Sequence, residues 1–323
     1  MVQRFLRTTI LSLAKAGWAR RMVTHWWLAR RVVSRFIAGE SLENALAVIR
    51  TLNQRGITAS VDCLGENTTR PEEANAAADE VIRALEAIDY AGVQANVSLK
   101  LTQLGLLLDE TLCRENLRQV LSRARELNIF VRIDMEDSPL TERTIQTWDW
   151  ARQQGFDNVG LVIQSYLYCS ENDICHILTS SGRVRLCKGA YDEPAEVAFP
   201  QKTQVDANYD QLATLLLEGA ARAGSPPVSS DGRTPPIPAF ATHDETRVRY
   251  VQVEMERLKL PRSAVEFQML YGIRRDLQDS LAAQGYPVRV YVPYGTHWYP
   301  YFMRRLAERP ANIWFFISNF FKK

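Results

Sequence analysis

The strongest constraint on the fold is a regular alternation of two kinds of segment over most of the chain. Short runs rich in β-branched residues, typical of strands, occur at about 60–65, 95–103, 129–135, 159–166, 183–190, 238–243, 264–270 and 287–292. Helical periodicity fills most of the intervals, as in Pro71–Ile88, Asp109–Leu127, Thr141–Gly155 and Val205–Ala223. Eight strands that alternate with helices predict an α/β fold, a parallel (β/α)8 barrel of the TIM type, rather than an open sheet. The turn after the first run, 64–67, also lacks the GxGxxG pattern of open dinucleotide-binding sheets.

A helix near the C-terminal end carries a specific charge pattern. Tyr301, Arg304, Arg305 and Glu308 fall on one stripe of it, at i, i+3, i+4 and i+7. A solvated charged face is the ordinary interpretation, but Glu308 lies C-terminal to Arg304, which is the poorer orientation for helix support. Two neighbouring guanidiniums suit forked recognition of a carboxylate or phosphate. We therefore expect this last helix to lie over the mouth of a distorted barrel.

Charge and cysteine content exclude several classes of protein. The net charge of +2 arises because residues 1–39 carry eight Lys/Arg and no acid, which leaves 31 basic against 37 acidic residues in the body. The overall balance is therefore no evidence for nucleic-acid binding. Five scattered cysteines and four unclustered histidines predict reduced thiols, a cytoplasmic setting and no protein-bound metal. No apolar run reaches the roughly 18 residues of a transmembrane helix.

The two ends of the chain differ from the body. Residues 1–55 are basic, aromatic and amphipathic, and they predict a helical arm packed on a barrel that spans residues 56–323. A transit peptide is the alternative for the Arg-rich start. The aromatic tail 313–323 ends in two lysines, so it suits either packing on the body or a membrane interface. The stretch 224–236, rich in Gly, Ser and Pro, predicts a loop.

Polar side chains end most of the predicted strands, where barrel enzymes place their chemistry. The candidates from the second to the seventh strand are Lys100, Asp134, Gln164, Arg185, Lys188, Thr242, His243 and Gln268. One buried charge is commonly half of a structural ion pair, but repetition over most strand ends predicts a polar site. Lys100 suits a Schiff-base nucleophile, and Arg185 with Lys188 and the following backbone equally suits cofactor phosphates. The residues alone leave both chemistries open.

The strand motifs resemble those of the proline dehydrogenase family, flavin-dependent barrel enzymes of proline catabolism. The motifs SLKLTQLG, RIDMED, VIQSY, VRLCKGAY, FATHD, EFQMLYG and YVPYG…YPYFMRRLAER occur in the family's order over roughly residues 55–312. The last motif, with its Tyr and two Arg, is the most specific. The length resembles the short, monofunctional bacterial form of the family.

The resemblance implies a role for each matching residue. Asp134 and Arg185 would lie beside the flavin and the reacting centre. Substrate contacts would come from Lys100, Leu270, Tyr291, Tyr301, Arg304, Arg305 and Glu308. Contacts to FAD would come from Met135, Gln164, Arg185, Lys188, Gly189, Ala190, Thr242 and His243. Glu66 matches a family position that gates the site by pairing with the first clamp arginine.

The implied reaction is oxidation of L-proline to 1-pyrroline-5-carboxylate, with hydride transfer from C5 to N5 of FAD. The step needs a neutral amine, which an excess of positive charge from Lys100, Arg185, Arg304 and Arg305 would favour. Electrons would pass to a membrane quinone, with possible peripheral contact at the inner face of the plasma membrane through either end of the chain. Two alternatives are a Lys100 Schiff-base aldolase and a non-enzymatic membrane-surface adaptor that uses residues 1–40 and the tail.

Overall fold

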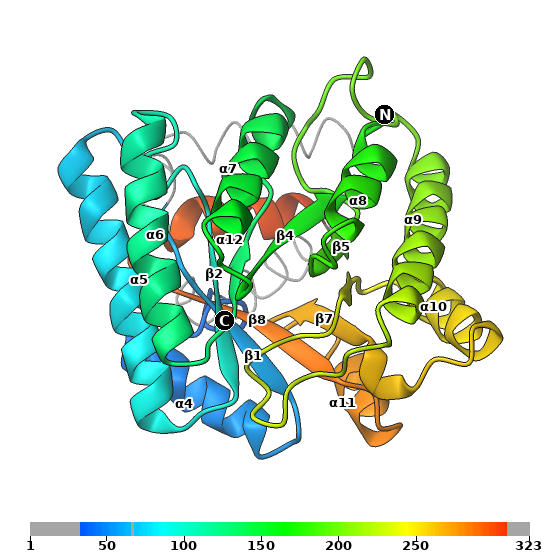
Figure 1. Cartoon of the computed structure of the whole chain (residues 1–323). Coiled ribbons are helices and arrows are strands. Elements are labelled where there is room, and N and C mark those ends of the chain that lie inside the picture. Colours follow the sequence, from blue (N-terminus) through cyan, green and yellow to red (C-terminus); the bar gives the residue numbers. More distant parts are fainter. Residues whose placement is uncertain (1–32, 66–67, 309–323) are drawn as a thin grey trace, which may run out of the picture.

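The chain folds into a closed barrel of eight parallel strands (Figure 1). A computed structural model describes residues 33–65 and 68–308 of the 323 residues. Neighbouring strands follow chain order, and β1 closes on β8 with Thr58 opposite Arg289. The strands are β1 (Thr58–Cys63), β2 (Ala95–Leu99), β3 (Val131–Ile133), β4 (Val159–Gln164), β5 (Val184–Cys187), β6 (Pro238–Ala241), β7 (Glu266–Leu270) and β8 (Val288–Tyr294). The (β/α)8 barrel predicted from the alternation is confirmed.

Helices surround the barrel and connect its strands. They are α4 (Leu42–Asn53), α5 (Pro71–Ala91), α6 (Glu110–Glu126), α7 (Thr141–Gln153), α8 (Ser170–Leu178), α9 (Lys202–Arg222), α10 (Glu245–Arg257), α11 (Arg275–Ala283) and α12 (Trp298–Glu308), with 3-10 turns at Ser138–Leu140 and Arg262–Ala264. Helix α5 illustrates the local rules, since proline opens its first turn and Gly92 ends it in the left-handed region at φ 60°. Its apolar residues repeat at helical spacing, so one face of the helix is buried against the barrel.

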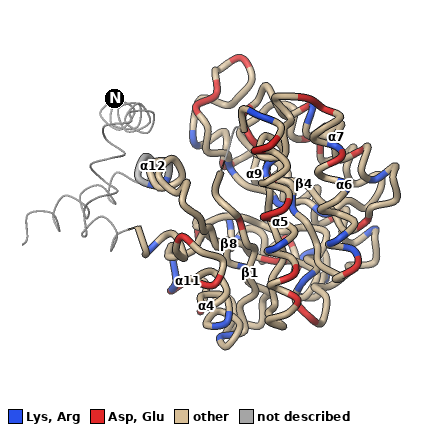
Figure 2. The backbone as a smooth tube through the Cα atoms, turned by 90° about the vertical axis from the view of Figure 1, so that its left-hand side faces the viewer, with Lys and Arg blue, Asp and Glu red and all other residues tan. Residues whose placement is uncertain are grey.

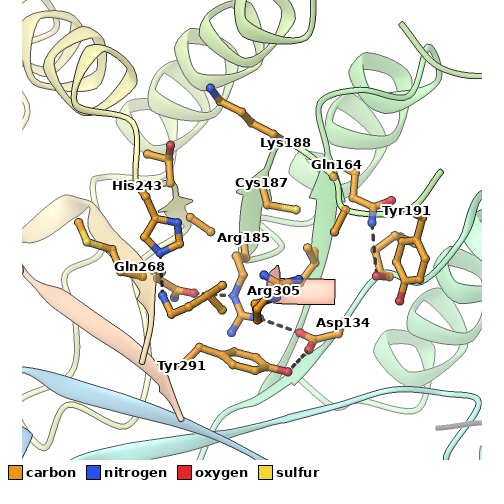
Figure 3. Close-up of a pocket in the computed structure, with 18 of the residues that line it drawn as sticks. Asp134, Gln164, Arg185, Cys187, Lys188, Tyr191, His243, Gln268, Tyr291 and Arg305 are labelled. Carbon is orange, nitrogen blue, oxygen red and sulfur yellow. Dashed lines mark hydrogen bonds and ion pairs between the residues drawn. The ribbon is translucent and has the colours of Figure 1, made fainter. Parts of the chain in front are cut away.

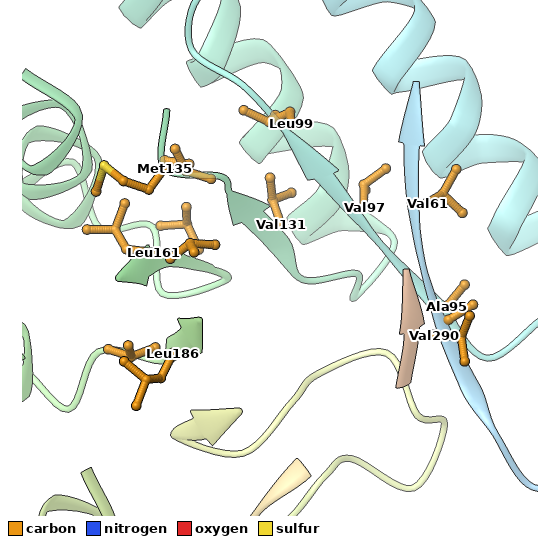
Figure 4. Packing of buried hydrophobic residues seen from close by; sticks show 14 of the residues in the cluster. Val61, Ala95, Val97, Leu99, Val131, Met135, Leu161, Leu186 and Val290 are labelled. Carbon is orange, nitrogen blue, oxygen red and sulfur yellow. The ribbon is translucent and has the colours of Figure 1, made fainter. Parts of the chain in front are cut away.

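Each strand presents apolar residues to the helices and alternate residues to the barrel interior. Val61, Val97, Val131 and Leu161 belong to the outward set, which packs with helix residues in one large core (Figure 4). The inward positions are unusually polar. The hydroxyls of Ser60 and Ser98, on the neighbouring strands β1 and β2, lie 2.9 Å apart inside the barrel, where barrels commonly place bulky branched side chains. A polar interior therefore marks this barrel.

A chain of hydrogen bonds runs through that interior. We call it the polar column, and it consists of Arg289, Glu266, Gln268, Arg185, Asp134 and Tyr291. At the end of the column near the amino ends of β7 and β8, Arg289 and Glu266 form an ion pair of 2.9 Å in which both side chains are fully buried. Arg289 also donates to the carbonyl of Gly232, at 2.8 Å, in the predicted loop 224–236. The column thus joins this loop to the catalytic end of the barrel.

The segment before the barrel is described from residue 33 onward. Helix α4 begins after Ser41, whose hydroxyl accepts from the backbone N–H of Asn44, and buries Leu46 and Ile49. Upstream of it, the Phe36 ring lies 6.3 Å from the Phe302 ring of α12. The predictions for residues 1–32 and for the tail from 309 onward lie outside the described residues. Within the described part, no helix is long and apolar enough to cross a membrane.

The backbone view in Figure 2 shows basic and acidic residues interspersed over the described part of the face displayed. Many belong to exposed pairs within one helix, such as Arg118 with Glu115 and Arg257 with Glu254. Such pairs contribute little to stability and give no broad field of one sign.

Candidate active site

A cavity of about 360 Å³ opens at the carboxyl ends of the strands. Its volume lies in the range of small-molecule sites. Most of the site residues expected from the sequence line it, namely Lys100, Asp134, Met135, Gln164, Arg185, Lys188, Gly189, Ala190, Thr242, His243, Leu270, Tyr291, Tyr301 and Arg305. They come from β2 to β8 and from α12, so the barrel brings together what the sequence separates by some 200 positions.

Arg185 is the centre of the hydrogen-bond network in this cavity (Figure 3). Its guanidinium donates to Asp134 at 2.7 Å, to the Ser98 hydroxyl at 3.0 Å and to the amide oxygen of Gln268. The ring of Tyr291 lies below it, with 5.4 Å from the guanidinium carbon to the ring centroid. A buried, always-charged fork is thereby fixed in one orientation by residues from four different strands or strand ends.

Asp134 receives two further contacts. The Tyr291 hydroxyl donates to it at 2.7 Å, and the Lys100 ammonium lies 3.9 Å away. Burial, as the larger cause, and the negative charge of Asp134 raise the pKa of Tyr291 well above its usual value. The phenol therefore stays protonated at any working pH and remains a hydrogen-bond donor.

Lys100 is held from the opposite side by Asp62, which the sequence analysis did not single out. The ammonium nitrogen lies 3.2 and 3.3 Å from the two carboxylate oxygens of Asp62, whose side chain is fully buried. The positive excess expected from Lys100 and Arg185 is consequently smaller than predicted, because each cation lies against a carboxylate. A polar residue at every second position of the first two strands (Ser60, Asp62, Asn96, Ser98) was the signal that could have revealed this interior.

The strand end of β4 presents an amide with an open acceptor. Gln164 is only 3% exposed, and its Oε1 has no hydrogen-bond partner among the described residues. Its Nε2 lies 3.5 Å from the carbonyl of Met135. A buried acceptor that faces a cavity calls for a donor on the molecule that fills it.

His243 is fixed in one tautomer. Its Nε2 accepts the backbone N–H of Leu270 at 3.0 Å, so the neutral ring carries its proton on Nδ1. Thr242, beside it, accepts the backbone N–H of Asp244 at 3.1 Å. These contacts order the β6 end of the cavity without any bound group.

Lys188 and Gly189 form the β5 end. The Lys188 ammonium is bound by Asp206 at 2.5 Å and by Asp244 at 2.7 Å, which orients it before any ligand arrives. Gly189 has φ 108°, and a Cβ there would come within 2.6 Å of the Tyr166 ring. Only glycine fits this turn, so the backbone can approach a ligand closely.

The loop after β5 lines the cavity with its first residues, from Lys188 to Tyr191. We call residues 188–200 the strap. Glu193 of the strap accepts the Ser138 backbone N–H at 2.8 Å, contacts the Ser138 hydroxyl, and accepts the Tyr166 hydroxyl at 3.3 Å. One carboxylate thus fastens the strap to the loops that follow β3 and β4.

Helix α12 supplies the remaining wall. Tyr301 is 6% exposed and lines the cavity together with Arg305, whose guanidinium carbon lies 5.3 Å from the Tyr301 ring centroid. The predicted stripe therefore faces the site at these two positions. The expectations for Glu66 and for the side chains of Arg304 and Glu308 lie outside what the structure describes. Among the described residues no group of three or more metal-ligating side chains occurs.

The fold and site together define a barrel of the enzyme type, with a polar small-molecule cavity at the carboxyl ends of its strands. The family model of proline dehydrogenase matches residues 45–316. The chain belongs to the proline dehydrogenase family.

Individual relatives agree with this assignment. The chain is 41% identical to proline dehydrogenase 1 of Bacillus subtilis over 290 residues, which cover 90% of each protein. It is 38% identical to proline dehydrogenase of Deinococcus radiodurans over 328 residues, the full length of both. The crystal structure of proline utilization A from Bdellovibrio bacteriovorus, inactivated by N-propargylglycine, superposes with a TM-score of 0.79 at 25% identity. That match covers 95% of this chain but only 36% of the longer protein.

Proposed function

We propose that this enzyme oxidises L-proline at C5 to 1-pyrroline-5-carboxylate with FAD as its cofactor. Membership of the proline dehydrogenase family, with relatives that align over their full length, supports proline as the substrate. The cavity supports the chemistry, because it combines cations for a carboxylate with an apolar and amide-lined wall. When bound, FAD would supply the two-electron acceptor that takes the hydride from C5.

The residues of the cavity fit a flavin. The open acceptor of Gln164 suits a ring N–H, and the glycine turn at Gly189 admits close backbone contact. Lys188 and Ala190 extend this side, with Met135, Thr242 and His243 on the neighbouring strand ends. The proposed cofactor site therefore spans the ends of β3 to β6.

The substrate carboxylate is assigned to the last helix. Arg305 and Tyr301 line the cavity from α12, and we place Arg304 and Glu308 with them because they share the helix stripe. Lys100, Leu270 and Tyr291 would complete the substrate pocket, and Glu66 would gate it. Two cations that bind the proline carboxylate would fix the orientation of C5 toward the cofactor. Part of the binding energy would thereby be used to align the reacting atoms.

Loss of the proline ammonium proton must precede hydride transfer. Asp134 is the acidic side chain of the cavity wall, and it already accepts hydrogen bonds from Arg185 and Tyr291. These two donors hold the Asp134 side chain in place, so its proposed role is to orient the amine and Arg185 while the proton leaves. The clamp arginines then favour the neutral amine through their charge.

Lys100 argues against the alternative of a Schiff-base aldolase. A nucleophilic lysine must be a neutral amine, whereas the Asp62 carboxylate at 3.2 Å favours the charged ammonium. The contact with Asp62 instead supports a role for Lys100 in binding proline. Borohydride trapping of a carbonyl substrate on Lys100 would reverse that conclusion.

We propose a membrane quinone as the electron acceptor. A bacterial, cytoplasmic enzyme would reach it by touching the membrane surface through its basic arm (residues 1–55) or through the aromatic tail that ends the catalytic barrel unit of residues 56–323. The eight basic and no acidic residues of 1–39 support attraction to anionic lipid. A surface adaptor without chemistry would leave the cavity unexplained.

An absorption spectrum tests the central proposal. The purified chain should show a flavin band that bleaches when proline is added without another acceptor. Arg305→Met should keep the band and lose the bleaching, because the substitution removes a clamp cation from the substrate side only. Arg275→Met, on the surface of α11, is the matched control and should bleach like the parent. A colourless chain that takes up no FAD would refute the proposal.

A further inference from the structure

One cysteine lies inside the cofactor cavity, and the proposed reaction gives it no role. Cys187 ends β5 and lines the cavity between Arg185 and Lys188. We propose that Cys187 is a thiol modification site for soft electrophiles, open before the flavin binds and closed once it is bound. The inference rests on the proposed cofactor site, and it adds a reactive group to that site.

The strand register places the thiol beside the cofactor's expected contact. Cys187 is the direct partner of Gln164 in the pairing of β4 with β5, and neighbouring strands lie about 4.8 Å apart. Figure 3 shows the sulfur on the side that faces Gln164. Gln164 in turn is buried with an open acceptor, which is independent evidence that a ligand belongs here. A ring that satisfies Gln164 must also cover Cys187.

Access decides whether this thiol reacts. Cys187 is partly exposed and lines the cavity, so an electrophile that enters the cavity can reach the sulfur. The neighbouring cations are already paired with acids, Arg185 with Asp134 and Lys188 with Asp206 and Asp244. The bound cofactor would remove the access.

The other cysteines supply internal standards. Cys113 is fully buried, and burial raises the pKa of its thiol to about 12. Cys63 is partly buried outside the cavity lining, and burial together with the charge of Asp62 raises its pKa to about 12. Cys169 and Cys175 are exposed on the surface. Cys175 is thus accessible whether or not the cavity is filled.

The reaction needs no oxidant. With an N-substituted maleimide, the sulfur forms a bond to one carbon of the C=C double bond, the π bond breaks, and the thiol proton ends on the adjacent carbon. The adduct then occupies space in a cavity of about 360 Å³. Cofactor uptake should therefore fail after modification.

The experiment treats the full chain with N-ethylmaleimide, once as purified with FAD and once after the flavin has been removed. Peptide mass spectrometry follows each cysteine with time. Labelling of Cys187 should slow by about the ratio of free FAD to its Kd, roughly tenfold at ten times Kd, while Cys175 labels equally in both forms. Equal rates at Cys187 in the two forms would overturn the inference.

A second measurement does not depend on labelling rates. Flavin-free chain treated with maleimide should no longer regain the flavin spectrum, whereas treated Cys187→Ser should regain as much as untreated Cys187→Ser. Uptake of FAD by a parent chain that mass spectrometry shows to be fully modified at Cys187 would also overturn it. If the chain never binds FAD, the proposed function is refuted, whatever the labelling shows. If Cys187 of that flavin-free chain also remains unlabelled, the inference about the thiol is refuted as well.

Discussion

Arg185→Lys is the substitution that tests the site most directly. The guanidinium makes three side-chain hydrogen bonds, to Asp134, Ser98 and Gln268, and stacks on Tyr291. A lysine keeps the charge and can retain one of these bonds, so two are lost. Hydrogen bonds that involve a charged group contribute about 1.5–3 kcal/mol each, which gives a loss of about 3–6 kcal/mol in the free energy of unfolding.

That loss converts into measurable quantities. At about 2.1 cal/mol/K per residue, unfolding of 323 residues carries an entropy of roughly 0.7 kcal/mol/K, so Tm should fall by about 4–9 °C. Turnover should fall about 100-fold, since Asp134 loses its fixed orientation beside the substrate. Calorimetry and single-turnover bleaching of the flavin band measure the two effects.

Arg132→Lys is the matched control. Arg132 is 1% exposed and donates to the carbonyls of Leu161 and Arg183 at 2.9 and 2.6 Å, but it does not line the cavity. It should lose stability while turnover per folded molecule is retained. If Arg185→Lys kept its Tm within about 1 °C and its rate within about threefold, the assignment of Arg185 as the centre of the network would be wrong.

Two further predictions concern the surroundings of the site. Burial raises the pKa of Asp210 to about 6, despite Arg247. The folded carboxyl therefore binds a proton between about pH 4 and 6 that the unfolded one releases, so its contribution to stability falls as pH rises through that window. The Tm difference between Asp210→Asn and the parent should accordingly shift in favour of the variant from pH 4 to 7, and a constant difference would contradict the shift. Glu193→Ala should release the strap and raise the FAD dissociation rate several-fold in stopped-flow measurements, with Glu196→Ala as control; an unchanged rate would show that Glu193 does not hold the strap.

The sequence predicted the barrel because alternation is a local property. Prediction from alternation is least accurate at strand ends, because tertiary contacts decide where each strand stops. The run 95–103 ends as a strand at Leu99, since the Lys100 N–H is taken by the Gln103 side chain and a turn follows. The run 129–135 yields only Val131–Ile133 as a strand. Both endings place a polar residue at the barrel mouth.

Motifs and strand-end polarity pointed to single residues that line the cavity but missed what depends on partners. The lining positions that they did not anticipate are Val162, Cys187, Tyr191, Ala241 and Met269. Asp62 and Ser98 escaped notice because a buried serine or aspartate in a strand acquires meaning only from what faces it across the barrel. Gln268 was a strand-end candidate, but its link to Glu266 could not be foreseen.

The loop 224–236 has the composition of a spacer, and spacers usually tolerate shortening. Here the carbonyl of Gly232 receives the Arg289 guanidinium, and Arg233 reaches the carbonyl of Leu127 at 3.1 Å. The loop therefore shields from solvent the end of the polar column at which Arg289 is fully buried, while the other end of the column lines the cavity. Shortening the loop would expose Arg289 to water and loosen the hydrogen bonds of Glu266 and then of Gln268. It would thereby disturb catalysis from the end of the barrel opposite the cavity.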